Sequence, residues 1–365
     1  MATTYRYLLA DLLTNDIIAE LPLTGVAFTE QLNQAGTFSG HILLSGVNTT
    51  KFNVIASTIP GRSVIYVDRD GVLVWGGIIW NRSYGSSSQQ LSISAREFES
   101  YFERRRITQT VDFANVDELL VAQTLVTDAQ AASSGNIGVI VGTETSGVLL
   151  SRTYYGYELK TVYNALQDLS RADDGFDFNI EVAYDPITLL PTKTLALGYP
   201  RTGTVYSYDD PNAPVFEFPA GNVVEYEYPE DGAITANVIY ALGAGSNEGK
   251  LIESDSNATQ LTSGWALLED TSNYSDVTDS TYLASLATAQ VLAVAAPPAV
   301  IKLVVPAYEN PVFGTYGIGD DARLRILDDR FPDQLDEIYR IVGLSVQPGE
   351  DGPERVTLTL TFTTN

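Results

Sequence analysis

A tight hairpin signal in the first hundred residues constrains the fold of this chain more than any other feature. Residues 64–67 (VIYV) and 72–75 (VLVW) are short apolar runs, and Asp70-Gly71 lies in the turn between them. β-Branched and aromatic residues favour strands, and an Asp-Gly pair suits the positive φ of a tight hairpin turn. Residues 91–95 (LSISA) then alternate apolar and polar side chains, as a strand with one buried face does. This region is therefore predicted to be an antiparallel β-meander.

A similar order of strands and turns recurs near the C-terminus. There Gly319 precedes three segments with strand character, which are residues 323–327 (RLRIL), 341–344 (IVGL) and 356–359 (VTLT). The separation between Gly77 and Leu91 differs by one residue from that between Gly343 and Val356. We therefore predict two copies of one small meander, with Gly77 and Gly343 at equivalent positions in corresponding strands.

The residues between the two meanders carry helical patterns. Leu159, Val162, Tyr163, Leu166 and Leu169 form one apolar stripe, which predicts a helix. A second helix is predicted over 119–129, with Asn115 as its cap. Residues 176–182 alternate as a strand does, and 246–280 is a polar, loop-rich insertion that leads into a helix over 283–294. Pro297-Pro298 is predicted to stop that helix.

These patterns together predict a mainly β protein with α insertions (α+β). It has two tandem-related small β-barrel or meander domains and helix-containing domains between them. A length of 365 residues at about 150 residues per domain agrees with two or three such units. The predicted domains are an N-terminal β-barrel (1–105), a helix-rich domain with a strand (106–185), a β-rich domain with a polar loop and helix insertion at about 246–296 (186–298), and a C-terminal β-barrel (299–365).

Charge and composition narrow the function classes. The formal net charge is −25, which disfavours binding to nucleic-acid backbones and anionic membranes. The chain has no cysteine and one histidine, so disulfides, thiolate metal sites and clustered imidazole ligands are excluded. The longest apolar stretches, 72–80 and 291–301, are shorter than the roughly 18 residues of a membrane span. No membrane insertion by this chain is expected.

Several motifs invite a catalytic or ligand-binding reading, and each has a simpler explanation. Gly243-Ala244-Gly245 with Gly249 precedes no amphipathic helix, so a glycine-rich turn is favoured over a dinucleotide site. Asp68 and Asp70 have the spacing of a calcium loop, but the hairpin explains them. His41 lies mid-strand with no Gly-x-Ser-x-Gly elbow and is interpreted as a solvated or cross-strand histidine. We predict no catalytic, cofactor-binding or metal-binding residues.

Clusters of charged residues are the remaining candidate functional sites in the sequence. The basic cluster 104–106 (RRR) follows several glutamates, so it is predicted to neutralise a helix C-terminus or to pair with acids of a neighbouring subunit. The acidic pairs 209–210, 320–321 and 328–329 leave weak cation binding open. With 46 acidic residues, carboxylate pairs of glycosidase type are inevitable and carry little information.

Five stretches of the chain resemble a known family of proteins. They are residues 5–11 (YRYLLAD), 36–40 (GTFSG), Asp70-Gly71 leading into 75–78 (WGGI), 175–178 (GFDF), and the closing pattern from Gly319-Asp320 through 343–344 and 347–349 to 356–360. This order resembles the minor tail proteins, or tail-tip hub proteins, of long-tailed actinobacteriophages. The family's fold is related to that of contractile-phage baseplate hubs and type VI secretion spikes.

The resemblance implies a structural virion protein at the tail tip, made in the host cytoplasm, with no enzymatic activity and no cofactor. It implies a homotrimer whose two barrels per chain give a pseudo-sixfold ring that adapts a threefold tip to a sixfold tube. The implied partners are the distal tail protein or tail tube, the tape measure protein, and downstream tip or fibre proteins. Tape measure and DNA would pass through the hub during ejection, with DNA in passage and not bound.

Two other readings remain open from the residues alone. One is a carboxylate-dependent hydrolase of cell-wall glycans, and the other is a carbohydrate-binding β-protein whose tyrosines stack on sugars. Neither accounts for two similar meanders in one chain. Since the last predicted strand ends near Phe362 and the chain ends at Asn365, no appended lytic or fibre domain is expected.

Overall fold

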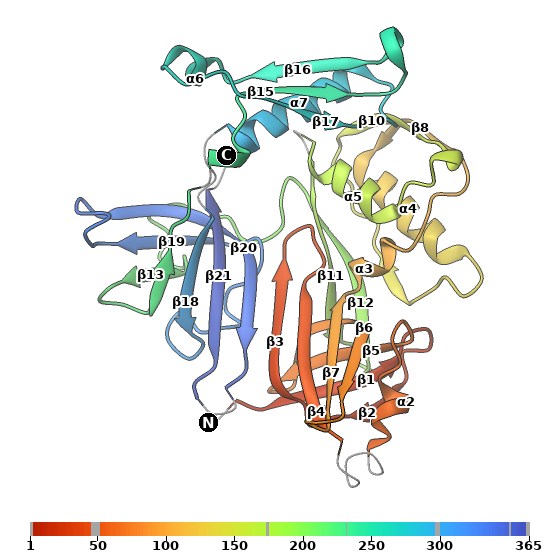
Figure 1. The fold of residues 1–365 in the computed structure, drawn as a ribbon, viewed down its shortest axis with the longest axis vertical. Helices are drawn as coiled ribbons and strands as arrows, with labels where there is room; N and C mark the ends of the chain where they lie inside the picture. The colour runs from red at the N-terminus through yellow and green to blue at the C-terminus, as the bar shows by residue number, and fades with distance from the viewer. Residues whose placement is uncertain are drawn as a thin grey trace.

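The computed structural model describes residues 3–44, 52–172, 175–230, 232–295, 300–349 and 352–362. Its elements fall into a first meander, a helix-containing middle region, and a second meander with an insertion (Figure 1). The first meander contains β1 (Tyr5–Asp11), β2 (Ile17–Glu20), β3 (Thr24–Gln31), β4 (Thr37–Leu43), α2 (Val54–Ser57), β5 (Ser63–Arg69), β6 (Val72–Gly85) and β7 (Gln90–Glu97).

The middle region contains α3 (Glu99–Phe102), β8 (Val111–Asp117), α4 (Glu118–Ala131), β9 (Val139–Val141), β10 (Leu149–Tyr154), η1 (Gly156–Glu158), α5 (Val162–Ser170), β11 (Asp177–Tyr184) and β12 (Pro191–Gly198). The second meander contains β13 (Val215–Phe218), β14 (Glu225–Glu227), β18 (Ile301–Pro306), β19 (Asp321–Ile326), β20 (Leu335–Gln347) and β21 (Arg355–Phe362). Its insertion contains η2 (Gly232–Ile234), β15 (Val238–Leu242), η3 (Asn247–Gly249), β16 (Ile252–Ser256), α6 (Ala258–Thr262), β17 (Glu269–Asn273) and α7 (Ser280–Val294).

The mainly β fold class predicted from the sequence is confirmed, and the two meanders are joined into one sheet. The strand order is β14-β18-β21-β20-β3-β4-β7-β6-β5-β1-β2, with β19 pairing to β20 and β13 to β19. The ladder of the described strands is open, with β2 at one end and β14 at the other. The predicted barrels are therefore not closed, because β3 uses its second side to pair with β20 of the other meander.

Strands β1 and β5 and the first part of β6 are buried on both faces, which explains their continuous apolar runs. Ile65 and Val67 of β5 belong to a core shared with strands of the second meander. Val64 and Tyr66, on the opposite face, pack in a second core with α4, α5 and β11. Alternate residues of a strand point to opposite faces, so a strand covered on both sides is apolar throughout. The helices α4 and α5 therefore form a layer over one face of this meander (Figure 1).

The predicted hairpin is present between β5 and β6. Asp70 has φ 53° and Gly71 has φ 89°, the left-handed conformations expected of a tight hairpin turn. Asp68 is buried and accepts a hydrogen bond from the Gly71 amide at 2.8 Å. Its other oxygen accepts from the Tyr184 hydroxyl of β11 at 2.6 Å. The turn is therefore stabilised from within and tied to the middle region.

The two meanders share one pairing order along the chain. In the first, the pairs are β1–β5, β3–β4, β4–β7, β5–β6 and β6–β7; in the second, they are β13–β19, β14–β18, β18–β21, β19–β20 and β20–β21. One difference is that β1 is antiparallel to β5, whereas β13 is parallel to β19. The repeated order supports the prediction of two copies of one meander.

The register corrects the predicted equivalence of the two glycines. Both β6 and β20 carry a bulge against the following strand, between Ile79 and Asn81 and between Ile341 and Gly343. When the two bulges are aligned, Gly343 corresponds to Asn81, and Gly77 corresponds to Tyr339. The prediction was wrong because it compared only the distance in sequence from each glycine to the following strand. The turn after β20 is longer than the turn after β6, so similar distances correspond to positions that differ by four residues.

The middle region forms its helices where predicted, with one cap revised. α5 begins after Thr161, whose hydroxyl accepts a hydrogen bond from the Asn164 amide at 3.1 Å. α4 begins after Asp117, whose carboxylate accepts from the Leu119 amide at 3.0 Å. Asn115 is not the cap: it lies in β8 with φ 56°. An Asp at the N-cap also suits the positive end of the helix dipole.

The insertion is more ordered than its polar sequence suggests. It forms a three-stranded sheet in the order β16-β15-β17, with α7 packed against it (Figure 1). The loop-rich prediction was wrong because two strands made largely of polar residues pair with the apolar strand β15. The Asp276 carboxylate, between β17 and α7, contacts the buried guanidinium of Arg152 at 2.7 Å and the ammonium of Lys160 at 2.9 Å. The predicted stop at Pro297-Pro298 lies outside the described residues.

Substituting Gly77 tests the packing of the central strands. A Cβ added there would lie 2.3 Å from the backbone oxygen of Arg96 and 2.5 Å from the Trp75 ring. We expect Gly77→Ala to lower the free energy of unfolding by about 1–3 kcal/mol, because an overpacked core must shift its backbone. Gly249→Ala, where a Cβ would meet nothing within 4 Å, is the matched control. Urea denaturation of both variants measures the difference, and equal stabilities would contradict this packing.

Candidate functional site: an assembly edge and an acidic cavity

The histidine considered for catalysis is a cross-strand residue. His41 on β4 pairs with Thr24 of β3 and with Ser92 of β7. Its ring lies against Gly25, where a Cβ would approach the imidazole Cε1 to 2.5 Å. The interpretation of His41 as a cross-strand histidine is therefore confirmed.

The glycine cluster is a turn, as predicted. Gly245 has φ 100°, and the backbone amides of Gly243 and Leu251 donate to the carbonyls of Leu251 and Ala244. The segment after it is a single 3-10 turn followed by β16. It offers no helix N-terminus to hold a phosphate.

The basic cluster contacts a helix end. The guanidinium of Arg105 donates to the carbonyl oxygen of Ala129, in the last turn of α4, at 3.1 Å. Arg104 lies over the Trp80 ring at 5.6 Å, and Arg106 donates to the Leu159 carbonyl at 3.3 Å. Contact with a helix C-terminus, one of the two predicted roles, is thus present through Arg105. Pairing with a neighbouring subunit stays a prediction.

Several carboxylates of the acidic pairs bind groups of the protein itself. Asp321 is buried and forms an ion pair with Arg201 at 2.6 Å, while Asp320 accepts from the amides of Thr204 and Gly317. Asp328 accepts from the Tyr226 hydroxyl at 2.5 Å. Within the described ranges, no three His, Cys, Asp or Glu side chains are arranged to hold a metal ion together. Nor does any helix in those ranges have the length and apolarity needed to cross a membrane.

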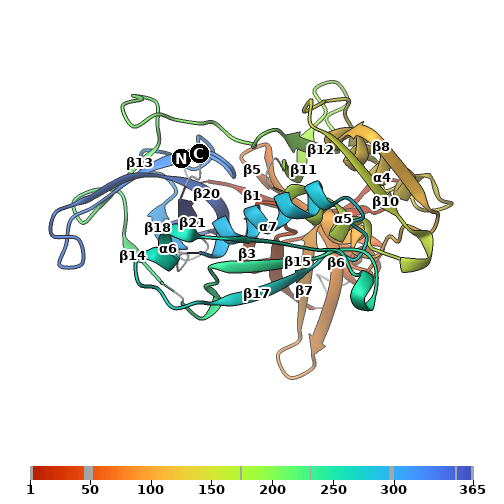
Figure 2. The same ribbon diagram turned by 90° about the horizontal axis from the view of Figure 1, so that it is seen from above.

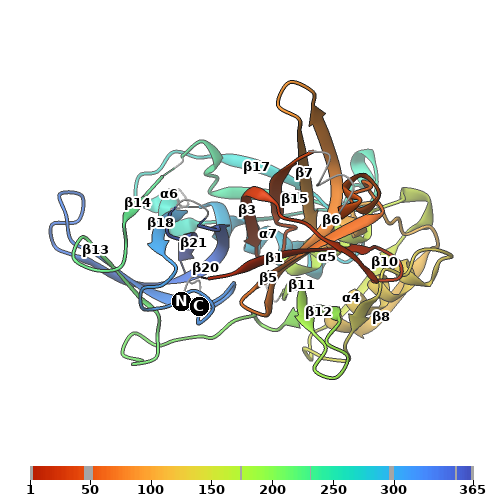
Figure 3. The same cartoon turned by 90° about the horizontal axis from the view of Figure 1, so that it is seen from below.

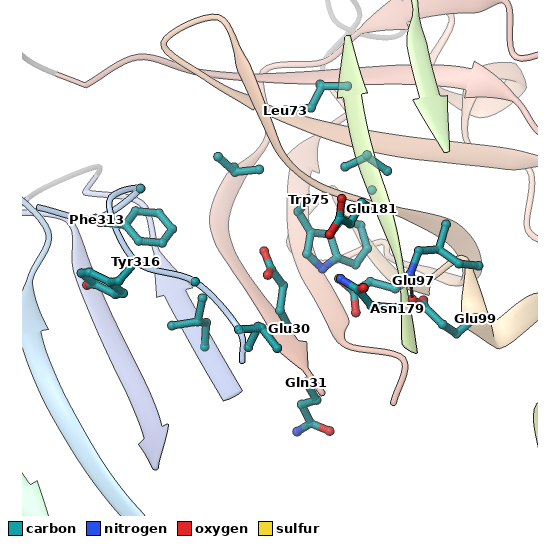
Figure 4. Close-up of a pocket in the computed structure, with 18 residues that line it drawn as sticks. Glu30, Gln31, Leu73, Trp75, Glu97, Glu99, Asn179, Glu181, Phe313 and Tyr316 are labelled. Atoms are coloured by element: carbon teal, nitrogen blue, oxygen red, sulfur yellow. Dashed lines mark hydrogen bonds between the residues drawn. The ribbon is translucent and has the colours of Figure 1, made fainter. Parts of the chain in front are cut away.

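An acidic cavity of about 270 Å³ lies where the two meanders and the middle region meet (Figure 4). Glu30 projects from β3, Glu97 and Glu99 come from the end of β7 and the start of α3, and Glu181 comes from β11. Figure 4 shows the labelled acids beside Trp75, with Phe313 and Tyr316 on the opposite side. Sequence reasoning missed this cavity because its acids come from three segments far apart in the chain.

Burial controls the charge state of these acids. Glu99 is 3% exposed, and its Oε1 accepts from the Ile180 amide. Burial raises the pKa of Glu99 to about 7, and burial together with the neighbouring carboxylates of Glu99 and Glu181 raises the pKa of Glu30 to about 7. Burial also raises the pKa of Glu97 well above its usual value, although its Oε2 accepts from the Gly36 amide at 2.6 Å. The cavity therefore resists full ionisation near neutral pH.

These raised pKa values predict how stability depends on pH. Between about pH 4.5 and pH 7 the folded chain binds more protons than the unfolded chain, so the contribution of these groups to stability falls as pH rises. We expect Glu30→Gln to reduce this loss by about 1 kcal/mol, since it removes one repelling carboxylate from a half-buried position. Urea unfolding at about pH 5 and pH 8 measures it. Glu248→Gln, on the exposed turn η3, is the control, and an identical effect in both variants would contradict the assignment.

We call the ladder between β3 and β20 the joint between the meanders. Each strand of this joint has a counterpart in the other meander that lacks a second pairing partner among the described residues. β3 pairs with residues 343–346 of β20, with Gln31 opposite Gly343 and Phe28 opposite Val346. In the second meander, the strand that corresponds to β3 is β14, and it pairs with β18 alone among the described residues. In the first meander, the residues that correspond to 343–346 are 81–84 of β6. They pair with β7 on one side and with no described backbone on the other.

The unpaired part of β6 extends away from the body of the molecule. Figures 2 and 3 both show the β6–β7 hairpin projecting from the rest of the fold. Tyr84 near its tip is 53% exposed, although tyrosine favours half-buried strand positions. β14, at the other end of the sheet, carries the exposed acids Glu225 and Glu227, and charged side chains are a common protection of an open strand edge. The described strands thus leave two edges without a second pairing partner, and the β14 edge is the one that carries acidic charge.

Comparison with known proteins places this fold. No protein-family profile matches the chain, and no curated protein matches its sequence. A tail protein from Neisseria meningitidis MC58 has a similar structure, with TM-score 0.61 and 14% identity over 97% of this chain and 96% of that one. The 43 kDa tail protein of prophage MuSo2 from Shewanella oneidensis has TM-score 0.60 and 12% identity over 98% of each chain. This chain has the fold of phage tail proteins.

Two further solved structures extend the likeness. Prophage tail protein gp18 from Listeria monocytogenes EGD-e has TM-score 0.56 and 12% identity, over 97% of this chain and 94% of that one. A chain of the lidless PdpA-VgrG complex has TM-score 0.53 and 6% identity, over 99% of this chain and 65% of that one. The tail-protein fold is therefore shared at low sequence identity across nearly the whole chain.

Proposed function

We propose that this chain is a structural virion protein, the tail-tip hub of a long-tailed actinobacteriophage, and that three copies form a ring. The observation that carries the proposal is the joint between β3 and β20 inside each chain. Its two halves have counterparts that lack a pairing partner among the described residues, at the edge of β14 and at residues 81–84 of β6. A head-to-tail contact of this kind gives a closed ring when its rotation closes.

The register inside the chain specifies the contact between chains. Phe28 faces Val346 and Glu30 faces Leu344 across the internal joint. Their counterparts by alignment are Tyr228 and Glu230, which follow β14, and Tyr84 and Arg82 in β6. Across the ring, Tyr84 would face the Tyr228 of the next copy, and Arg82 would face its Glu230. An aromatic pair and an opposite-charge pair both favour antiparallel strand pairing.

The ring solves a symmetry problem at the end of a tail. Three chains with two similar meanders each present six similar surfaces toward a sixfold tube, while the lower face keeps threefold symmetry. We propose that the distal tail protein or tail tube binds above, that tip or fibre proteins bind below, and that tape measure and DNA pass through the channel. A net charge of −25 per chain disfavours retention of DNA in that passage. We assign the chain no catalytic role.

A double-cysteine variant tests the ring contact, because the chain has no cysteine of its own. Residues directly opposite in an antiparallel pair have Cα atoms about 4.5–5.5 Å apart, within the range that a disulfide spans. We expect Tyr84→Cys with Tyr228→Cys to give, on oxidation of assembled tails or of concentrated protein, a covalent three-chain product that disappears on reduction. Non-reducing gel electrophoresis with mass determination measures it.

The controls distinguish disulfides that form across the proposed strand pairing from disulfides that form by random collision of chains. Tyr84→Cys with Tyr157→Cys keeps one cysteine and moves the other to an exposed tyrosine on η1, and it should give no three-chain product. Each single variant should give a dimer at most. A dimer as the main product of the double variant, or a three-chain product from the control pair, would contradict the proposed ring.

A further inference from the structure

The acidic cavity presents hydrogen-bond acceptors that lack donors. Oε2 of Glu99 and Oδ1 of Asn179 are buried and have no hydrogen-bond partner among the described residues, and the same is true of the Tyr316 hydroxyl. All three residues line the cavity. The carboxylate of Glu30 also accepts no hydrogen bond from the described part of the chain. A buried polar atom without a partner is costly, so this arrangement indicates a ligand that donates hydrogen bonds.

The charge of the lining favours a cation. Four glutamates and no Lys, Arg or His belong to the lining. The cation closest in sequence, Arg96, forms an ion pair with the Glu103 carboxylate at 2.7 Å and also acts to lower the pKa of Glu99, so it offsets only part of the negative charge of the cavity. Glu97 is partly satisfied by the Gly36 amide, and Glu181 is exposed at the edge of the cavity. A cationic guest would therefore relieve the remaining repulsion among these carboxylates.

The remaining walls discriminate between kinds of cation. The indole of Trp75, which is 1% exposed, and the rings of Phe313 and Tyr316 line the cavity together with aliphatic side chains such as Leu344. Aromatic faces and alkyl walls suit an alkylammonium, whose head has three N–H donors and whose stem is apolar. A bare divalent metal would need several oxygen ligands converging on one point, and no group of three acids in the described ranges does so.

We propose that this cavity binds a primary ammonium group, supplied either by a free polyamine or by a lysine side chain of a partner protein. The ammonium donates to Oε2 of Glu99, to Oδ1 of Asn179 and to the Glu30 carboxylate. Its alkyl stem lies against Trp75. This site is separate from the ring edges, so it does not depend on the proposed assembly.

Binding is coupled to proton release. An ammonium pairs with ionised carboxylates, whereas the pKa values of Glu30 and Glu99 near 7 mean that these groups are partly protonated at neutral pH. The ligand amine, with a pKa near that of lysine at about 10.4, stays charged throughout this range. Affinity therefore rises as pH increases through neutrality, and protons leave the cavity as the ligand enters.

Isothermal titration calorimetry of the full chain with n-butylamine and with putrescine tests the proposal. We expect saturable binding at one site, about tenfold tighter at about pH 8 than at about pH 6, since at least one carboxylate must lose its proton. Glu99→Gln should weaken binding about tenfold, as expected when a charged hydrogen bond is lost. Glu30→Gln should do the same, and it removes no described hydrogen bond, so folding is retained. Glu248→Gln, on the exposed turn η3, should leave binding unchanged.

The choice of probes distinguishes the sources and the class of ligand. Equal affinity for both amines supports a lysine side chain as the guest, and about tenfold tighter binding of putrescine supports a polyamine. Tetramethylammonium, which carries the charge without N–H donors, should not compete. The proposal is overturned if neither amine binds, if Ca²⁺ binds and the amines do not, if tetramethylammonium competes equally, or if both cavity variants bind amines as the parent chain does.

Discussion

The rest of this structure depends on the pairing of β3 with β20. This ladder joins residues 28–31 to residues 343–346, and so it brings together two meanders that lie at opposite ends of the sequence. The Trp75 indole of β6 donates to the carbonyl oxygen of Thr29 at 3.0 Å, which ties β6 to the same strand within the first meander. One core then spans strands of both meanders. Without this joint there would be two separate small sheets, each with an open edge.

The acidic cavity is a consequence of the same joint. Glu30 lies within the paired segment of β3 and Leu344 opposite it on β20, so the joint itself supplies part of the lining. The middle region covers the other side through β11, and this cover buries Glu99 and leaves Glu30 half-buried. Burial then raises their pKa values toward neutrality. The position that holds the two repeats together is thus also the position most sensitive to protons or cations.

Local signals in the sequence were sufficient for local structure. The Asp70-Gly71 turn and the stripe that ends at Leu169 each depend on a few neighbouring residues, and both were predicted. The equivalence of Gly77 and Gly343 was wrong by four residues, because a bulge and a longer turn shift the register without changing the apolar pattern. Register is a property of paired strands and is not encoded in one strand alone.

Long-range features were beyond the reach of sequence patterns. The polar strands β16 and β17 become strands because β15 offers them an edge on each side, which no pattern in 246–280 reveals. The cavity acids have no common motif, since Glu30, Glu99 and Glu181 meet only when β11 packs against the first meander. The fold of tail proteins was nevertheless predicted, because the order of strands and turns survives where sequence identity does not.

The central claim is that the joint made once inside each chain is made again between chains. A map of the assembled tail tip, at a resolution that separates strands, tests it most directly. We expect three copies around the tail axis, with Tyr228 and Glu230 of each copy, which follow β14, alongside residues 81–84 of the next copy's β6. A map with one, two or six copies, or with three copies whose β6 hairpins face solvent, would contradict it.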